Sequence, residues 1–162
     1  WEDSIMKKYY LAYGSNLNIP QMQYRCPEAR IVGTAVIEGY RLLFKGSKTG
    51  SYLTIEKADG YEVPVGVWEV TERDERNLDR YEGYPTFYYK KEMQLKVKGI
   101  RTGRIYDRNC FVYIMHEDHH IGIPTNFYVR VCAQGYRAFG FDTAKLKEAI
   151  DFSKEVLNGD ND

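Results

Sequence analysis

Residues 13–16 read Tyr-Gly-Ser-Asn and directly follow an apolar, aromatic run. A glycine at this point lets the backbone approach a ligand closely, and the N–H groups of Ser15, Asn16 and Leu17 can form a concave anion site. Because a helix is expected to begin at Asn18, its positive end would lie beside the same point. The alternative is a tight strand-to-helix turn in which Ser and Asn serve turn chemistry alone.

A candidate catalytic carboxylate occurs at Glu82, in the segment Arg-Tyr-Glu-Gly-Tyr-Pro at 80–85. A helix is expected to end here, before Gly83, and the negative end of its dipole would raise the pKa of the carboxyl group. Nearby aromatic residues can exclude water and raise this pKa further. A carboxyl group tuned in this way suits proton transfer near neutral pH. The alternative is an exposed glutamate on a surface turn. The aromatic neighbours are Tyr81, Tyr84, Phe87 and Tyr88.

The segment 116–120 contains His-Glu-x-x-His, the pattern of zinc metalloproteases. That chemistry requires His116 and His120 on one face of a helix and a third ligand elsewhere. Here a strand-like run precedes the motif, Gly122 and Pro124 follow it at once, and no histidine lies outside the segment. We therefore expect a solvated loop and no metal site.

The cysteines do not indicate a nucleophile or a disulfide framework. Cys26 precedes a proline, whereas Cys110 and Cys132 lie in strand-like apolar runs, where thiols are usually inert packing. Their odd number and the absence of a Cys-x-x-Cys pair are typical of a reducing compartment, so we expect a cytoplasmic protein. The sequence also lacks a Gly-x-Ser-x-Gly elbow and a phosphate-binding P-loop.

Composition limits the remaining classes of function. Lys plus Arg equals Asp plus Glu at 23 each, which gives no electrostatic argument for nucleic acid or an anionic membrane as a partner. No apolar run approaches the ~20 residues of a membrane span. Residues 1–5 are expected to be a vector-derived remnant before a natural start at Met6. Residues 6–162 are expected to form a single domain.

Strands are expected to dominate the elements that position these residues, because the 15 tyrosines favour β-structure. In the segment 91–98, Met93, Leu95 and Val97 alternate with polar residues, as in a half-buried antiparallel strand. Gly39 is expected to mark a bend. Short connections favour an α+β protein built on a small, closed or nearly closed, mainly antiparallel β-barrel with flanking helices. The expected strands are 8–13, 30–37, 40–45, 52–56, 63–70, 87–98, 104–115 and 128–133.

Three helices are expected to flank the barrel. The first spans about 18–25 with Asn18 as its N-cap. The second begins at Thr71, which stands at capping-box spacing from Asp74, and ends between residues 81 and 83. The third follows the cap Asp142 and carries an apolar stripe up to Leu157.

Four segments in this order resemble the γ-glutamylcyclotransferase family: YLAYGSNL, RCP-A, LDRYEGYP-FY and Y-VC-QG. The resemblance covers residues 8–157 and is to the branch whose loop reads Tyr-Gly-Ser-Asn rather than Tyr-Gly-Thr-Leu. It implies a small β-barrel with flanking helices and no metal or cofactor. It also implies an enzyme that releases a γ-glutamyl group as 5-oxoproline and frees an amine or amino acid.

The resemblance assigns roles residue by residue. Glu82 corresponds to the catalytic general acid/base, and Tyr128 to a binding tyrosine that precedes the last strand of the family. In the implied reaction the substrate's own α-amine attacks its γ-carbonyl, while the loop grips the α-carboxylate and stabilises the oxyanion. The substrate loop corresponds to Tyr13, Gly14, Ser15, Asn16 and Leu17.

Rival interpretations remain open at this point. The same fold can act on a γ-glutamylamine or on a γ-glutamyl intermediate of an antibiotic pathway. It can also serve as a non-catalytic small-molecule-binding domain, although a buried acid facing an anion argues against pure binding. A zinc hydrolase is the third rival. The expected partner is a small-molecule γ-glutamyl substrate, without nucleic acid or membrane, and the expected state is a monomer or homodimer.

Overall fold

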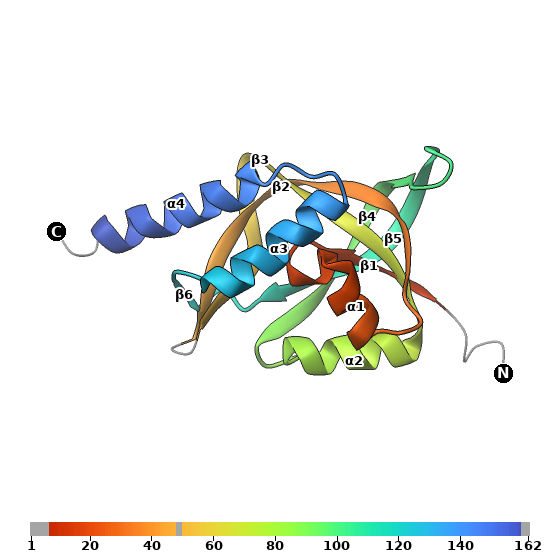
Figure 1. Cartoon of the computed structure of the whole chain (residues 1–162), viewed down its shortest axis with the longest axis horizontal. Coiled ribbons are helices and arrows are strands. Elements are labelled where there is room, and N and C mark those ends of the chain that lie inside the picture. Colours follow the sequence, from red (N-terminus) through yellow and green to blue (C-terminus); the bar gives the residue numbers. More distant parts are fainter. Residues whose placement is uncertain (1–6, 48–49, 160–162) are drawn as a thin grey trace.

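The computed structural model describes residues 7–47 and 50–159, so the expected vector-derived remnant at 1–5 lies outside the described residues. Figure 1 shows the strands and helices, which follow one another along the chain in mixed order and end with the two consecutive helices α3 and α4. The strands are β1 (Lys8–Ala12), β2 (Arg30–Ser47), β3 (Gly50–Val70), β4 (Tyr88–Gly99), β5 (Ile105–Met115) and β6 (His120–Ile121). The helices are the 3-10 turn η2 (Ser15–Leu17), α1 (Ile19–Arg25), α2 (Glu72–Glu82), α3 (Asn126–Ala138) and α4 (Ala144–Gly159).

Five of these strands close into a barrel in the order β3–β1–β5–β4–β2, because β2 pairs back with β3. The pairings are antiparallel with the exception of β1 and β5, which run parallel, with Tyr9 opposite Cys110. The expected small closed barrel with flanking helices is therefore confirmed, and its sheet is mixed rather than purely antiparallel. The short strand β6 pairs with the far end of β2, where Lys45 faces Ile121.

Strands β2 and β3 are longer than the sequence predicts. Each was expected as two short strands and is one continuous strand, of 18 and 21 residues respectively. The bend expected at Gly39 lies at a bulge-like shift of register, where the pairing passes from Glu38 opposite Glu62 to Tyr40 opposite Lys57. A bulge bends a strand without ending it. The hairpin therefore closes the barrel and continues beyond it toward β6 and α4 (Figure 1).

Local capping explains where the predicted helices begin. The Asn18 side-chain oxygen accepts a hydrogen bond from the Gln21 N–H at 3.3 Å and caps α1. Asp142 accepts from the Ala144 N–H at 2.9 Å at the start of α4. These bonds satisfy N–H groups that the first helical turn leaves without partners. The predictions for both helices are confirmed.

Helix α2 carries the candidate acid at its last residue. The predicted capping box is present, since the Thr71 hydroxyl accepts from the Asp74 N–H at 3.1 Å and the Asp74 carboxylate accepts from the Thr71 N–H at 3.2 Å. Gly83 ends the helix in the left-handed conformation, with a φ of 65°. A glycine adopts this conformation without the steric cost of a Cβ. The helix therefore ends at Glu82, within the predicted range.

The strand expected at 128–133 is wrong, because these residues lie within helix α3. The Thr125 hydroxyl caps this helix by accepting from the Tyr128 N–H at 3.1 Å. A short run of aromatic and β-branched residues fits a strand and a buried helix equally well. The longer pattern has the helical spacing of three and four, with Val131, Cys132, Gly135 and Tyr136 on the buried face. Tyr128 therefore reaches the site from a helix.

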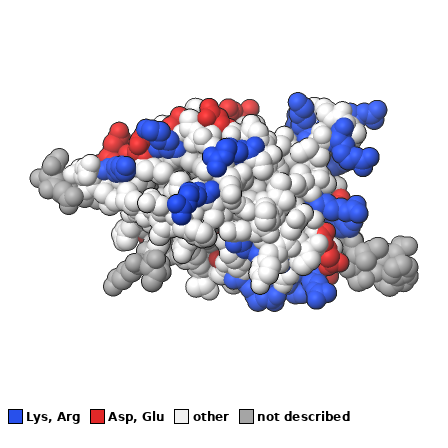
Figure 2. All heavy atoms as spheres, in the orientation of Figure 1, with Lys and Arg blue, Asp and Glu red and all other residues white. Residues whose placement is uncertain are grey.

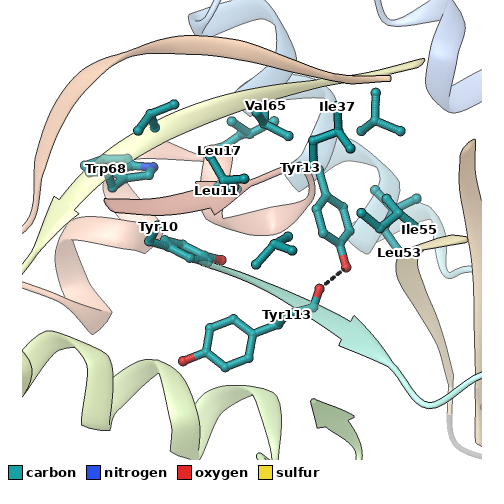
Figure 3. Packing of buried hydrophobic residues seen from close by; sticks show 14 of the residues in the cluster. Tyr10, Leu11, Tyr13, Leu17, Ile37, Leu53, Ile55, Val65, Trp68 and Tyr113 are labelled. Atoms are coloured by element: carbon teal, nitrogen blue, oxygen red, sulfur yellow. Dashed lines mark hydrogen bonds between the residues drawn. The ribbon is translucent and has the colours of Figure 1, made fainter. Parts of the chain in front are cut away.

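Packing inside the barrel fixes the segment that follows β1. Figure 3 shows the apolar interior around Leu11, where the Tyr13 hydroxyl donates to the Tyr113 carbonyl at 2.7 Å. From the other side, the Tyr136 hydroxyl of α3 donates to the Tyr13 carbonyl at 2.8 Å. The Asn18 amide donates to the Val131 carbonyl of α3 at 3.1 Å. Strand β5 and helix α3 thus hold this segment from opposite sides.

We predict that Gly135→Ala destabilises the protein by ~1–3 kcal/mol, the usual cost of overpacking. A Cβ at this position would lie 2.5 Å from the backbone carbon of Leu17 and 2.6 Å from the backbone nitrogen of Asn18. Urea denaturation should show a lower midpoint. Gly159→Ala is the matched control, because a Cβ at the end of α4 meets no atom within 4 Å. An unchanged midpoint for Gly135→Ala would show that α3 does not press on this segment.

Candidate active site

A pocket of about 390 Å³ gathers most of the sequence-predicted site residues. The segment after β1 contributes Tyr13, Gly14, Ser15 and Asn16, helix α2 contributes Glu82, and helix α3 contributes Tyr128; all six line the pocket. Almost 70 residues of sequence separate Glu82 from the segment after β1. Closure of the barrel and docking of α2 and α3 bring them together.

Leu17, which was predicted with the loop, does not line this pocket. Its side chain is fully buried in the core, and its N–H donates to the Gly14 carbonyl at 3.1 Å. The Asn18 N–H is likewise used, in a bond of 3.0 Å to the Ser15 carbonyl. Among the described residues, the N–H groups of Ser15 and Asn16 have no such partner. Two backbone donors, rather than the expected three, are therefore available to an anion.

Side chains of the loop bond to distant elements instead of to their own turn. The Ser15 and Tyr81 hydroxyls lie 3.0 Å apart. The Asn16 amide donates to the Tyr10 hydroxyl at 2.9 Å, and its oxygen accepts from Arg25 at 2.7 Å. A turn built only for its local geometry would use these side chains on neighbouring backbone groups. The observed bonds instead hold Ser15 and Asn16 rigidly at the wall of the pocket.

The Glu82 carboxyl group is partly buried at the pocket wall, where it is available to a ligand. Burial raises the pKa of Glu82 to about 8, and the nearby Arg25 guanidinium opposes part of this rise. The negative end of α2 acts in the same direction as burial. No hydrogen bond to this carboxyl group is found among the described residues. At neutral pH the group can therefore both take up and release a proton.

Tyrosine side chains form much of the surrounding wall. The Tyr88 hydroxyl donates to the Leu53 carbonyl at 2.9 Å, and the Tyr128 hydroxyl accepts from the Leu53 N–H at 3.1 Å. Burial raises the pKa of both tyrosines well above the ordinary value, so both remain neutral. Gly14 leaves room beside them, because a Cβ there would make a tight contact of 3.3 Å with the Tyr128 hydroxyl. The wall thus excludes water from Glu82 without adding charge.

Sequence reasoning missed several pocket residues. Tyr10 and Tyr113 lie in strands β1 and β5 and line the pocket. The alternation of side chains along a strand gives the face of the sheet on which each residue lies, but not that the residue lines a pocket. Arg25 does not line the pocket itself but contacts the wall residues Asn16 and Tyr81; it lies in the RCP-A segment quoted above, where nothing local predicts these contacts. Its guanidinium carbon stands 3.7 Å from the centre of the Tyr81 ring. Among the predicted aromatic neighbours of Glu82, Tyr84 does not line the pocket.

The histidine segment does not form the geometry of a zinc hydrolase. His116 follows the end of β5 and His120 lies in β6, so no helix presents the two rings on one face. The His116 ring nitrogen lies 2.8 Å from the Pro85 carbonyl, and the His119 ring packs against Phe87. Within residues 7–47 and 50–159, no three His, Cys, Asp or Glu side chains are grouped so that they could hold a metal ion.

The three thiols are free and buried. Burial raises the pKa of Cys26 and of Cys132 to about 12, and that of Cys110 to about 11. Thiolates are the nucleophilic form, and protonated buried thiols are inert. A cysteine nucleophile is therefore not supported by the environment of any of the three.

The surface and the helices add little about partners. Figure 2 shows Lys and Arg in separate groups on one face, with Asp and Glu beside several of them. In the described part of the chain, no helix is both long enough and apolar enough to pass through a membrane.

Fold and site together define a small mixed β-barrel protein in which a pocket that contains Glu82 is lined by several tyrosines and by a loop with two backbone N–H groups free of backbone partners among the described residues. The family model "Gamma-glutamyl cyclotransferase, AIG2-like" matches residues 10–130. The chain belongs to this family.

Known proteins agree with this assignment. Human gamma-glutamylcyclotransferase is 28% identical over 159 residues, which cover 91% of this chain and 82% of the human protein. The crystal structure of the human protein loc79017 has a TM-score of 0.75 at 26% identity and covers 87% of this chain and 86% of that one. A solved gamma-glutamyl cyclotransferase structure shares the fold, with a TM-score of 0.76 at 24% identity over 93% of this chain and 99% of the other.

Proposed function

We propose that the protein is a γ-glutamylcyclotransferase that converts a γ-glutamyl compound into 5-oxoproline and a free amine or amino acid. A bond forms between the substrate's α-nitrogen and its γ-carbon, and the bond from that carbon to the leaving nitrogen breaks. One proton moves from the attacking amine to the leaving amine. The observation that carries the proposal is that the Glu82 carboxyl group, with its raised pKa, lines the same pocket as Ser15 and Asn16, whose backbone N–H groups have no backbone partner among the described residues.

The loop would position the substrate. The N–H groups of Ser15 and Asn16 can hydrogen-bond the α-carboxylate and the oxyanion that develops on the γ-carbonyl oxygen. Fixing both ends of the glutamyl chain brings the α-amine within attack distance of the γ-carbon, which makes ring closure effectively unimolecular. Tyr128 lines the same pocket as Gly14 and would limit the space available to the bent chain.

Glu82 would transfer the proton. As a carboxylate it removes a proton from the attacking α-amine, and as an acid it then protonates the leaving nitrogen. A pKa of about 8 supports both steps at neutral pH, because neither form is scarce. A domain that only binds an anion gains nothing from a carboxyl group in this position, because the ionised form of that group repels the ligand. We therefore propose an enzyme rather than a binding module.

Release of 5-oxoproline tests this function. The purified protein is incubated with γ-glutamyl-alanine, ε-(γ-glutamyl)lysine and glutathione, and products are separated by liquid chromatography and mass spectrometry. We expect 5-oxoproline from at least one substrate, with the free leaving group in equal amount and with or without EDTA. Free glutamate in place of 5-oxoproline would indicate hydrolysis and contradict the proposal, as would a loss of activity in EDTA that zinc restores.

The rate should depend on pH through Glu82. Because the carboxylate starts the reaction, kcat/KM is expected to rise with pH up to about 8, where the pKa of Glu82 lies. Arg25 lowers this pKa, so Arg25→Met should move the rising limb to higher pH. The measurement is a pH profile of 5-oxoproline release for both proteins. A limb that stays at the same pH in Arg25→Met would show that another group controls the rate.

A further inference from the structure

A second groove, of about 760 Å³, opens beside the pocket. The two share walls, because Ser15, Tyr52, Tyr81 and Tyr128 line both. Ser15 and Tyr81, whose hydroxyls lie 3.0 Å apart, belong to this common boundary, so a ligand whose glutamyl part fills the pocket would reach the groove by crossing them. Since Glu82 and the loop hold the reacting carbon, the part of the ligand in the groove is the leaving group.

The groove is lined mainly by apolar and aromatic side chains. Helix α1 contributes Pro20 and Tyr24, and helix α3 contributes Phe127 and Val131. Tyr24 is 90% exposed and Phe127 is 65% exposed. Single exposed aromatic residues are ordinary on a protein surface, but here several line one concave region that adjoins the pocket. Such a surface favours an apolar group of moderate size.

Arg25 provides the one full charge among the described residues that line the groove. Its guanidinium carbon lies over the Tyr81 ring, 3.7 Å from the ring centre, and its N–H groups donate to Asn16 at 2.7 Å and to Gln21 at 2.9 Å. Neither partner is a carboxylate, and no salt bridge to Arg25 is found among the described residues. A guanidinium carries five N–H donors, so donors remain for a carboxylate of the ligand.

We propose that this groove is the leaving-group site and that it takes an α-amino acid with an aromatic or branched side chain and a free carboxylate. The proposal rests on the proposed function. The leaving carboxylate pairs with Arg25, and the leaving side chain packs against Phe127 and Tyr24. A polyamine would instead bring a positive charge toward Arg25. A glycyl leaving group would leave the apolar wall unused.

Substrates that differ in one feature test the proposal. We compare kcat/KM for γ-glutamyl-phenylalanine, γ-glutamyl-leucine, γ-glutamyl-glycine, γ-glutamyl-phenethylamine and γ-glutamyl-putrescine. The phenylalanine and leucine compounds are expected to exceed the glycine compound by ~10-fold or more, in keeping with the selectivity of apolar pockets. Loss of the carboxylate in the phenethylamine compound should also cost ~10-fold, through a lost charge-assisted contact.

Variants assign each preference to its residue. Phe127→Ser should reduce the preference for phenylalanine over glycine and leave turnover of γ-glutamyl-glycine near the parent rate. Arg25→Met should reduce the preference for phenylalanine over phenethylamine, measured at the pH optimum of each protein. Ile105→Ser is the control, because Ile105 is 58% exposed on β5 and does not line the groove. Circular dichroism and thermal midpoints check that each variant is folded.

The outcomes separate this proposal from the function on which it rests. Similar kcat/KM for all five substrates, or preferences that Phe127→Ser and Arg25→Met leave unchanged, would overturn the leaving-group site and keep the cyclotransferase. Failure of every substrate to give 5-oxoproline would overturn both.

Discussion

Replacing Glu82 with glutamine is expected to reduce kcat by ~10²- to 10⁴-fold, the usual contribution of a general acid–base group. Glutamine keeps the size of the side chain but can neither take up nor deliver the proton. Binding of 5-oxoproline should persist, because the Ser15 and Asn16 N–H groups do not depend on the carboxyl group. The measurements are steady-state rates of 5-oxoproline release and calorimetric binding of 5-oxoproline.

The same substitution is expected to lower the rate without lowering the stability of the protein. The folded-state pKa of Glu82, about 8, lies above its ordinary value of 4.5. Between these values the folded state keeps a proton that the unfolded state has lost, so the free energy of unfolding of the parent falls as pH rises. Glu82→Gln lacks this penalty and should be at least as stable as the parent at pH 8.

Glu72→Gln is the matched control for both measurements. Glu72 lies in the first turn of the same helix, is exposed and does not line the pocket. Its substitution should leave the rate of 5-oxoproline release near that of the parent. A folded Glu82→Gln variant that turns over γ-glutamyl substrates at the parent rate would show that Glu82 is not the acid–base group.

Blocking the substrate's own nucleophile should abolish the reaction. An α-N-acetyl-γ-glutamyl substrate has no basic nitrogen with which to attack the γ-carbonyl, so neither 5-oxoproline nor its N-acetyl derivative should form. This is the largest effect that we predict, because the proposed reaction has no nucleophile other than the substrate's own amine. Mass spectrometry of the reaction mixture provides the measurement.

An α-N-methyl substrate is the control for added bulk. Its secondary amine remains nucleophilic, and it should yield N-methyl-5-oxoproline at a reduced rate. Release of N-acetylglutamate from the acetylated substrate would indicate attack by water or by a protein group. That product would contradict the cyclotransferase mechanism while leaving the pocket and its ligands intact.

The position of Glu82 at a helix end could be predicted because its causes are local. The capping bonds of Thr71 and Asp74 and the left-handed Gly83 each involve residues within a few positions of one another. Each residue type prefers its place for reasons that do not depend on the rest of the fold. The Tyr-Gly-Ser-Asn turn and the cap at Asn18 could be predicted on the same basis.

The strand expected at 128–133 failed for a complementary reason. Six residues are too few to separate a period of two from a period of 3.6 when most are apolar. Packing decides in favour of the helix, because one helical face packs against the segment after β1. The buried residues of this face are Val131, Cys132, Gly135 and Tyr136. The expected short strands of β2 and β3 are likewise continuous, because the two strands stay paired through shifts of register. Such a shift depends on the partner strand, which the local sequence does not specify.

The sequence by itself therefore determined the helix caps, the strand-rich character and the two segments that carry the candidate chemistry. Only the tertiary structure decided that these segments meet. The Ser15–Tyr81 and Tyr136–Tyr13 contacts join residues 66 and 123 positions apart, and they form because the barrel closes through the parallel β1–β5 pair. The same closure surrounds Glu82 with tyrosines and raises its pKa. Local preferences act over a few residues, whereas desolvation depends on all the elements that surround a group.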